Sequence, residues 1–273
     1  MLSTTDGYAV FLSTPWGRNH FFYRAFMNPD YSVHRVKSSM CPLIKQEFLE
    51  EMRRNMTEQA YRMEYEAEFA EAADSYFSQD LIRSCVDPNL KLTSTLEHQI
   101  PEGEYYCGCD FGKLQDHSVV TVLNRDGDKL ELVYMNEFPT ETPYTNVIGH
   151  IVRAHEGFQF RSAHVDQTGV GEPVLEELKN QNVPAEGLVF TVKTKEELLS
   201  CLKIAMEQKR LSIPYHLRLC QQINEQKCAY TKSGHLQFSH PEGSHDDMLW
   251  SLALAVWAAT MRRETQAKIV KAW

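Results

Sequence analysis

Four aspartates stand at the boundaries of expected regular elements, where the backbone fixes the direction of a side chain. Asp110 closes an expected strand, Asp166 directly follows another, and Asp246 and Asp247 open an expected helix. Glycine or another small residue lies close to each of them. Such an arrangement lets a fold bring carboxylates from distant parts of a chain to one place.

These carboxylates would suit divalent metal ions. Mg²⁺ and Mn²⁺ prefer oxygen ligands, and two such ions about 3.5–4 Å apart can activate water and stabilise a leaving oxygen in phosphodiester hydrolysis. We expect Asp110 to bridge two ions, with Asp166 and one of Asp246 or Asp247 holding the flanks. Sequence does not choose between the last two, because neighbouring helix residues point about 100° apart.

Plainer roles exist for each of these residues. Asp110 and Asp166 could shape turns, and Asp246 could cap a helix N-terminus. Two further groups, Asp116 and His245, could orient water or carry a proton near the metals, although a solvated turn residue and a polar residue before a helix are the alternatives. The combination of all the aspartates at element boundaries favours the metal site.

The elements that must position these residues form a mixed pattern of strands and helices, which indicates an α/β sheet flanked by helices. Between the second and third strands, residues 125–128 read Arg-Asp-Gly-Asp, a hairpin turn signal. The expected strands cover residues 104–111, 118–124, 130–138, 162–165, 188–192 and 234–239, and the expected helices cover residues 144–156, 173–182, 195–209, 216–226 and 246–263.

The N-terminal region has a different character. We expect strands over residues 8–12 and 33–38, and helices over residues 19–27, 43–56 and 57–71, with Thr57 as the N-cap of the last one. Residues 74–103 look loop-rich. We therefore divide the chain into domains at residues 1–80 and 98–273, with the boundary near residues 80–100.

Three motifs resemble the nuclease domain of terminase large subunits, the motors that cut viral DNA and package it into capsids. They are Gly108-Cys-Asp110-Phe-Gly-Lys-Leu-Gln-Asp116, Val165-Asp166-Gln-Thr-Gly169-Val-Gly171, and His245-Asp246-Asp247 ahead of an apolar helix. The last is the most specific, and the resemblance covers residues 100–262. It implies an RNase H-like fold and an endonuclease that cuts double-stranded DNA with two Mg²⁺ or Mn²⁺ ions during viral genome packaging.

The same resemblance implies partners and a location. Besides double-stranded DNA, these are a portal protein, a small terminase subunit or a separate ATPase chain, in the cytoplasm of an infected or lysogenic host cell. No membrane is expected, because no apolar run approaches the ~18 residues that span a bilayer and no secretory signal is visible.

The front of the chain is similar to the tail of a packaging ATPase. Residues 12–23 (LSTPWGRNHFFY) resemble the coupling motif late in that domain, and residues 61–69 (YRMEYEAEF) resemble the segment that links it to the nuclease. A phosphate-binding P-loop needs G-x-x-x-x-G-K-[ST]. Its nearest counterpart, residues 108–114, has one residue too few between the glycines and ends in Leu114. We therefore expect a partial ATPase remnant with no nucleotide-binding residues and no ATPase activity from this chain alone.

The net charge of -9 means that any DNA site is local or uses metal ions to offset the phosphates. Lys193, Lys195, Arg262 and Arg263 could contact the DNA backbone, or they could be ordinary solvated helix charges. The seven cysteines are scattered, which argues against a disulfide framework.

Two other functions stay open. Another RNase H-like nuclease, of the resolvase or integrase type, would use similar carboxylates, although it would not need the segment at residues 13–17. A non-catalytic terminase remnant would bind DNA or a packaging partner without cutting.

Overall fold

The computed structural model describes residues 7–15, 21–28, 30–69, 75–93, 96, 103–112, 116–168, 171–231, 235–241 and 244–270. The chain divides into two compact units, Met1–Asp74 and Ser75–Trp273.

The first unit is a set of short helices. Thr57 caps α3 as the sequence predicts, because its Oγ1 accepts a hydrogen bond from the backbone N–H of Ala60 at 3.2 Å. The helix ends at Ala67, which adopts a left-handed backbone with φ 53°. The helices are α1 (Phe21–Met27), the 3-10 helix η2 (Ser38–Met40), α2 (Gln46–Asn55) and α3 (Glu58–Glu66).

The strands expected at residues 8–12 and 33–38 are wrong for this structure, since both segments are irregular. Tyr8, Val10 and Leu12 are 96%, 78% and 91% exposed. A strand needs neighbours for its backbone hydrogen bonds, and the described residues of this unit form no strand that could supply them.

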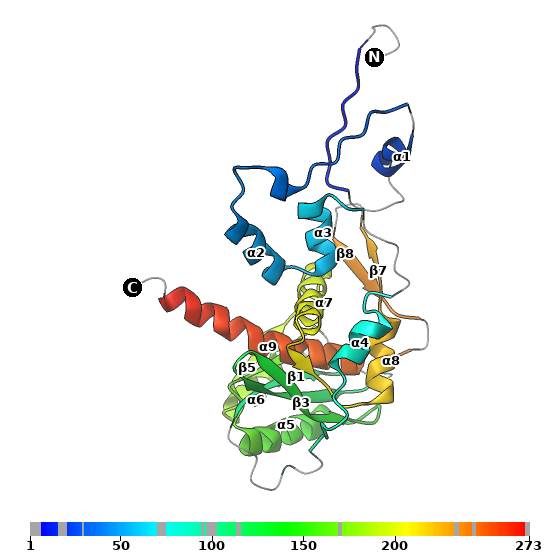
Figure 1. Cartoon of the computed structure of the whole chain (residues 1–273). Coiled ribbons are helices and arrows are strands. Elements are labelled where there is room, and N and C mark those ends of the chain that lie inside the picture. The colour runs from blue at the N-terminus through cyan, green and yellow to red at the C-terminus, as the bar shows by residue number, and fades with distance from the viewer. Residues whose placement is uncertain are drawn as a thin grey trace. The chain divides into compact units, whose positions relative to one another are not determined.

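The second unit is built on a six-stranded mixed sheet with the strand order β5-β4-β1-β2-β3-β6 (Figure 1). Antiparallel β1, β2 and β3 form a meander, β4 and β5 lie parallel to β1, and β6 lies parallel to β3. The strands are β1 (Glu104–Asp110), β2 (Val119–Asp126), β3 (Lys129–Glu137), β4 (Ser162–Asp166), β5 (Ala185–Leu188) and β6 (Leu211–Ser212), and a separate hairpin consists of β7 (Lys227–Tyr230) and β8 (Leu236–Ser239).

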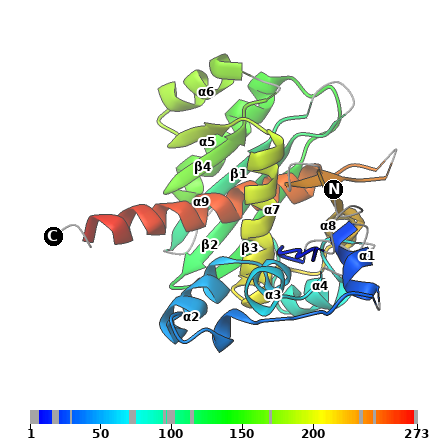
Figure 2. The ribbon, with the colours of Figure 1, turned by 90° about the horizontal axis from the view of Figure 1, so that it is seen from above.

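Helices cover both faces of this sheet. In Figure 1, α5 lies below the sheet and α9 above it, and in Figure 2 α9 runs across the strands and is crossed by α7. The helix α4 occupies a region that the sequence suggested was loop. The helices are α4 (Gln79–Cys85), α5 (Tyr144–Phe158), α6 (Gly171–Asn180), α7 (Val192–Glu207), α8 (Leu217–Glu225) and α9 (Asp247–Val270).

The alternation of β1 divides the core into two layers. Tyr105, Cys107 and Cys109 are buried with the apolar side chains of α5 and α6, whereas Tyr106 is buried with those of α7 and α9. Side chains alternate between faces along a strand, so Asp110 shares the α9 face with Tyr106.

The apolar start of α9 belongs to this core. Residues from Met248 to Val256 are buried in an unbroken run. No helix within the described ranges is both long enough and apolar enough to cross a membrane.

Candidate active site

Two of the predicted carboxylates come from neighbouring parallel strands. Asp110 is the last residue of β1 and Asp166 is the last residue of β4. Cys109 pairs with Val165 in the register of these strands, so the two aspartates are adjacent at the same edge of the sheet. Both lie on the face that α9 covers.

The start of α9 is brought to the same place by its packing on β1. The Ser251 hydroxyl donates a hydrogen bond to the Gly108 carbonyl oxygen at 2.9 Å. From Ser251 back to Asp247 is about 6 Å of helix, and from Gly108 forward to Asp110 is about 7 Å of strand. The antiparallel course of helix and strand therefore brings Asp247 alongside Asp110.

The electrostatics of Asp110 reflect the approach of the other carboxylates. Its side chain is buried, and burial, followed by the charges of Asp166, Asp247 and Asp246, raises its pKa well above the usual range. The nearby ammonium of Lys195 acts in the opposite direction. The site thus concentrates more negative charge than one lysine offsets.

Asp247 has a similar environment. Burial raises its pKa to about 6, with smaller contributions from Asp116 and Asp246 in the same direction. The backbone N–H of His117, which donates to its Oδ2 at 3.3 Å, lowers the pKa in part. A divalent cation would favour the ionised form of both buried carboxyls.

Asp246 is held differently from its neighbour. Its Oδ2 accepts hydrogen bonds from the indole Nε1 of Trp250 at 2.8 Å and from the amide Nε2 of Gln226 at 2.9 Å. The two adjacent aspartates therefore have distinct surroundings, a distinction that sequence reasoning left open.

The Asp166 carboxylate is oriented by the turn that follows it. Its Oδ1 accepts hydrogen bonds from the backbone N–H of Thr168 at 2.8 Å and from the Thr168 hydroxyl at 2.6 Å. The hydroxyl oxygen in turn accepts a bond from the backbone N–H of Phe190 at 2.7 Å. Thr168, which the sequence did not single out, thus links Asp166 to the segment before α7.

Asp116 and His245 lie at the rim of this cluster. The Nδ1 atom of His245 is 3.9 Å from Asp116 Oδ1 and 3.8 Å from Asp247 Oδ2. The His117 ring meets the His245 ring edge-on at a centroid distance of 5.2 Å, and its Nδ1 is 2.9 Å from the Phe138 carbonyl oxygen. The sequence did not predict a role for His117, because its contact with Asp247 is made through its backbone N–H.

Of the four predicted DNA contacts, the structure brings Lys195 to the site. Its ammonium lies 4.9 Å from the centroid of the Trp250 ring. Lys193 is exposed and 3.8 Å from Glu197. Arg262 and Arg263 belong to α9, but their side chains lie outside the described residues.

The carboxylates gather without forming a finished coordination sphere. Among the residues that the structure describes, no three His, Cys, Asp or Glu side chains stand close enough to hold a metal ion. Ionised carboxylates repel one another, so a more open arrangement is expected before a cation joins them. The oxygen-only donor set of Asp110, Asp166 and Asp247 fits Mg²⁺ or Mn²⁺.

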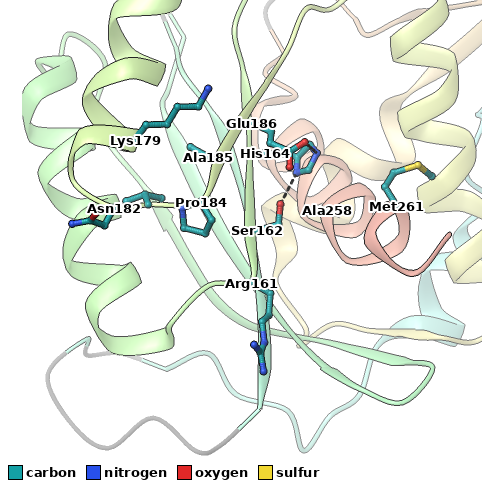
Figure 3. Close-up of a pocket in the computed structure, with 11 residues that line it drawn as sticks. Arg161, Ser162, His164, Lys179, Asn182, Pro184, Ala185, Glu186, Ala258 and Met261 are labelled. Carbon is teal, nitrogen blue, oxygen red and sulfur yellow. Dashed lines mark hydrogen bonds and ion pairs between the residues drawn. The ribbon is translucent and has the colours of Figure 1, made fainter. Parts of the chain in front are cut away.

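A cavity of about 610 Å³ lies elsewhere on the sheet, at the beginnings of β4 and β5 (Figure 3). Ser162 and Ala185, the first residues of these strands, line it together with Ala258 of α9. The His164 ring hydrogen-bonds Ser162 at 3.3 Å there. Asp166 ends the same strand, so the cavity is separate from the carboxylate cluster.

The mixed sheet, with carboxylates at the ends of β1 and β4 and at the start of α9, defines an RNase H-like nuclease fold. The sequence profile of the Terminase RNaseH-like domain family matches residues 107–259. This match spans more than half of the chain. The chain belongs to this family, which confirms the resemblance that the three aspartate motifs indicated.

Similar proteins come from phages of thermophilic bacteria. The terminase large subunit of Thermus phage G20c is 28% identical over 276 residues, and that of Thermus virus P23-45 is 29% identical over 277 residues. Each alignment covers 93% of this chain and 56% of the relative. The chain therefore spans little more than half the length of these proteins.

Solved structures agree with the fold. The large terminase nuclease of phage G20c with bound magnesium is 26% identical with a TM-score of 0.58, covering 68% of this chain and 98% of that one. The large terminase of bacteriophage D6E covers 91% of this chain and 61% of its own, with a TM-score of 0.64. At 12% identity, the second likeness is one of fold alone.

Proposed function

We propose that this chain is a metal-dependent endonuclease that cuts double-stranded DNA during viral genome packaging. The observation that carries the proposal is the convergence of Asp110, Asp166 and Asp247 at one edge of the sheet, with the pKa of Asp110 and Asp247 raised. The G20c nuclease crystallises with bound magnesium and with bound cobalt, which supports a divalent-ion site here.

Each carboxylate has a distinct role. Asp110, buried between the other two, would be a ligand shared by two ions, while Asp166 and Asp247 would each hold one of them. Bound ions of this kind supply an activated water and stabilise the departing oxygen of the phosphodiester. Asp246 supports the site from its bonds with Trp250 and Gln226 and is not a direct ligand.

The surrounding residues bind and orient the DNA. Lys195 contacts the phosphate next to the carboxylates, and Lys193, Arg262 and Arg263 contact the flanking backbone without reading sequence. His245 and Asp116, at the rim beside Asp247, orient water or carry a proton.

Residues 1–80 are the tail of a packaging ATPase with its helical linker, ahead of a nuclease domain over residues 98–273. The exposed apolar side chains of Tyr8, Val10 and Leu12 fit a surface that another part of the motor covers. We therefore assign ATP hydrolysis, and the contacts with the portal protein and the small subunit, to a larger assembly in the host cytoplasm.

Plasmid cleavage tests the function. Purified chain is incubated with supercoiled DNA in Mn²⁺, Mg²⁺ or EDTA, beside Asp110→Asn and Asp126→Asn, which changes an exposed aspartate on the hairpin at the far end of β2. We expect cutting in metal by the parent and by Asp126→Asn, and none by Asp110→Asn. A folded parent that never cuts would favour the non-catalytic remnant, and cutting by Asp110→Asn would point to a different site or a different nuclease.

A further inference from the structure

Gln222 of α8 and Gln226, the residue that follows the last residue of this helix, are two buried glutamines that contact the start of α9. Gln222 and Gln226 are 6% and 0% exposed, and they are one helical turn apart, so they share a face. Buried amides of this kind are costly unless they are hydrogen-bonded. Their partners show what they do.

Gln222 caps α9 from outside the helix. Its Oε1 accepts hydrogen bonds from the backbone N–H groups of Met248 at 2.9 Å and Leu249 at 3.3 Å. The first N–H groups of a helix have no partner within it. A side chain just before the helix usually supplies one, but here the Asp246 carboxylate bonds with Trp250 and Gln226 instead.

Gln226 holds the Asp246 carboxylate, which does not cap α9 because Gln222 does. Its Nε2 donates to Asp246 Oδ2 at 2.9 Å, which fixes the amide with the nitrogen toward Asp246. The buried Oε1 on its other side has no hydrogen-bond partner in the described part of the chain. The hydrogen bond from Gln226 to Asp246 is therefore kept although it leaves the Gln226 Oε1 without a partner among the described residues.

We propose that Gln222 and Gln226 are positioning residues that assign different roles to the two adjacent aspartates. Gln222 fixes the first turn of α9 so that Asp247 points toward Asp110, and Gln226 holds Asp246 beside Trp250, out of the metal-binding position. This inference rests on the proposed nuclease function, because it names what orients one ligand of that site.

Mn²⁺ binding by calorimetry tests the idea on the full chain. Gln222→Met and Gln226→Met keep the side-chain length and remove the hydrogen bonds, whereas Gln221→Met changes the exposed neighbour on the same helix. Neither glutamine bonds a proposed ligand side chain, so each would act by placing the start of α9, and loss of such outer support of a metal site typically costs about 10–100-fold in metal affinity. We expect a loss of this size in both buried variants and parent-like binding in Gln221→Met.

Two further readouts separate positioning from simple packing. Gln222→Glu keeps an oxygen for the Met248 and Leu249 N–H groups, so it should recover most of the affinity that Gln222→Met loses. In cleavage, the buried variants should lower kcat while KM for DNA stays near the parent value. If Gln222→Met does not fold, Gln226→Met and Gln222→Glu decide the question.

The outcomes distinguish the two proposals. If the parent takes up Mn²⁺ and cuts DNA, and folded Gln226→Met and Gln222→Met do the same with parent values, the positioning role is wrong. If the folded parent itself neither binds Mn²⁺ nor cuts, the nuclease function is wrong, and the roles built on it fall with it.

Discussion

Ser251 lies so close to Gly108 that a Cβ atom at residue 108 would stand 2.1 Å from the Ser251 carbonyl oxygen. The backbone of Ala255 is almost as near, with its nitrogen 2.4 Å from that Cβ position. The helix α9 thus packs backbone to backbone on β1. This contact sets the distance between Asp110 at the end of β1 and Asp247 at the start of α9.

Gly108→Ala should therefore push the helix off the strand. Overpacking of a core typically costs about 1–3 kcal/mol, and we expect at least this loss in the free energy of unfolding measured with urea. Gly149→Ala in α5 is the matched control, because nothing lies within 4 Å of its added Cβ. Equal stability of the two variants would contradict the close packing of α9 on β1.

Removing a repelling carboxylate should stabilise the metal-free protein. Asp110 is buried among other acids, which raise its pKa, so its ionised form destabilises the fold at neutral pH. Asp110→Asn should unfold at a higher temperature than the parent in EDTA. In Mg²⁺ the difference in unfolding temperature between the two proteins should shrink or change sign, since the ions stabilise only a protein whose site binds them. An Asp110→Asn protein less stable than the parent in EDTA would argue against a strained acidic cluster.

Ionisation of Asp247 should likewise destabilise the metal-free protein, and this effect should appear in the pH dependence of stability. Its folded pKa of about 6 exceeds the usual 3.8, so the folded state binds more protons than the unfolded state between these values. In EDTA, this carboxyl should cost stability as pH rises from about 4 to about 6, on the order of 2–3 kcal/mol in all. The half-buried His150 and His155 and the buried His164 have a pKa lowered by burial, so they cost stability as pH falls below 6.5, in the opposite direction.

The Asp247 contribution is therefore measured as the difference between the parent and Asp247→Asn across pH. The advantage of the variant should grow from pH 4 to pH 6 and then level off. A difference that is flat across this range would show that Asp247 titrates normally.

The two adjacent aspartates should respond unequally to substitution. Asp247→Asn removes a proposed metal ligand, and we expect Mn²⁺-dependent cleavage to fall by about 100-fold or more. Asp246→Asn keeps an oxygen that can accept a hydrogen bond from Trp250. Because Asp246 supports the site without binding the metal in our proposal, we expect a smaller loss of activity, about 10–100-fold. Initial cleavage rates compare them, and a larger loss in Asp246→Asn would reverse the assignment.

Lys195 should matter more than its neighbour Lys193. Lys195→Met removes the cation whose charge acts on Asp110, whereas Lys193→Met removes an exposed charge that faces Glu197. Lys195→Met should weaken DNA binding about equally for all sequences and reduce the slope of log affinity against log salt by about 1. Fluorescence anisotropy over a salt series checks this, and a parent-like slope would remove Lys195 from the phosphate contacts.

The sequence predicted the central elements because local signals agreed there with the tertiary structure. The strand that ends at Asp110 and the capped helix after Thr57 both lie where expected. The expected strand at residues 188–192 is displaced, since β5 ends at Leu188 and α7 begins at Val192 behind a Thr191 capping box. A short apolar run does not distinguish a strand from the segment after it.

The site was predictable in its residue types and not in its detailed roles. Asp110 and Asp166 stand out because each ends a strand. The choice between Asp246 and Asp247 depends on Gln226, which comes from another helix, and no local pattern connects the two. The contribution of His117 depends on its backbone N–H, which carries no sequence signal.

The most direct measurement is an anomalous-diffraction map of crystals of this chain grown with Mn²⁺. We expect two manganese peaks about 3.5–4 Å apart, with Asp110 between them and Asp166 and Asp247 on either side. Manganese bound elsewhere, or a fully occupied site that excludes Asp110, would contradict it.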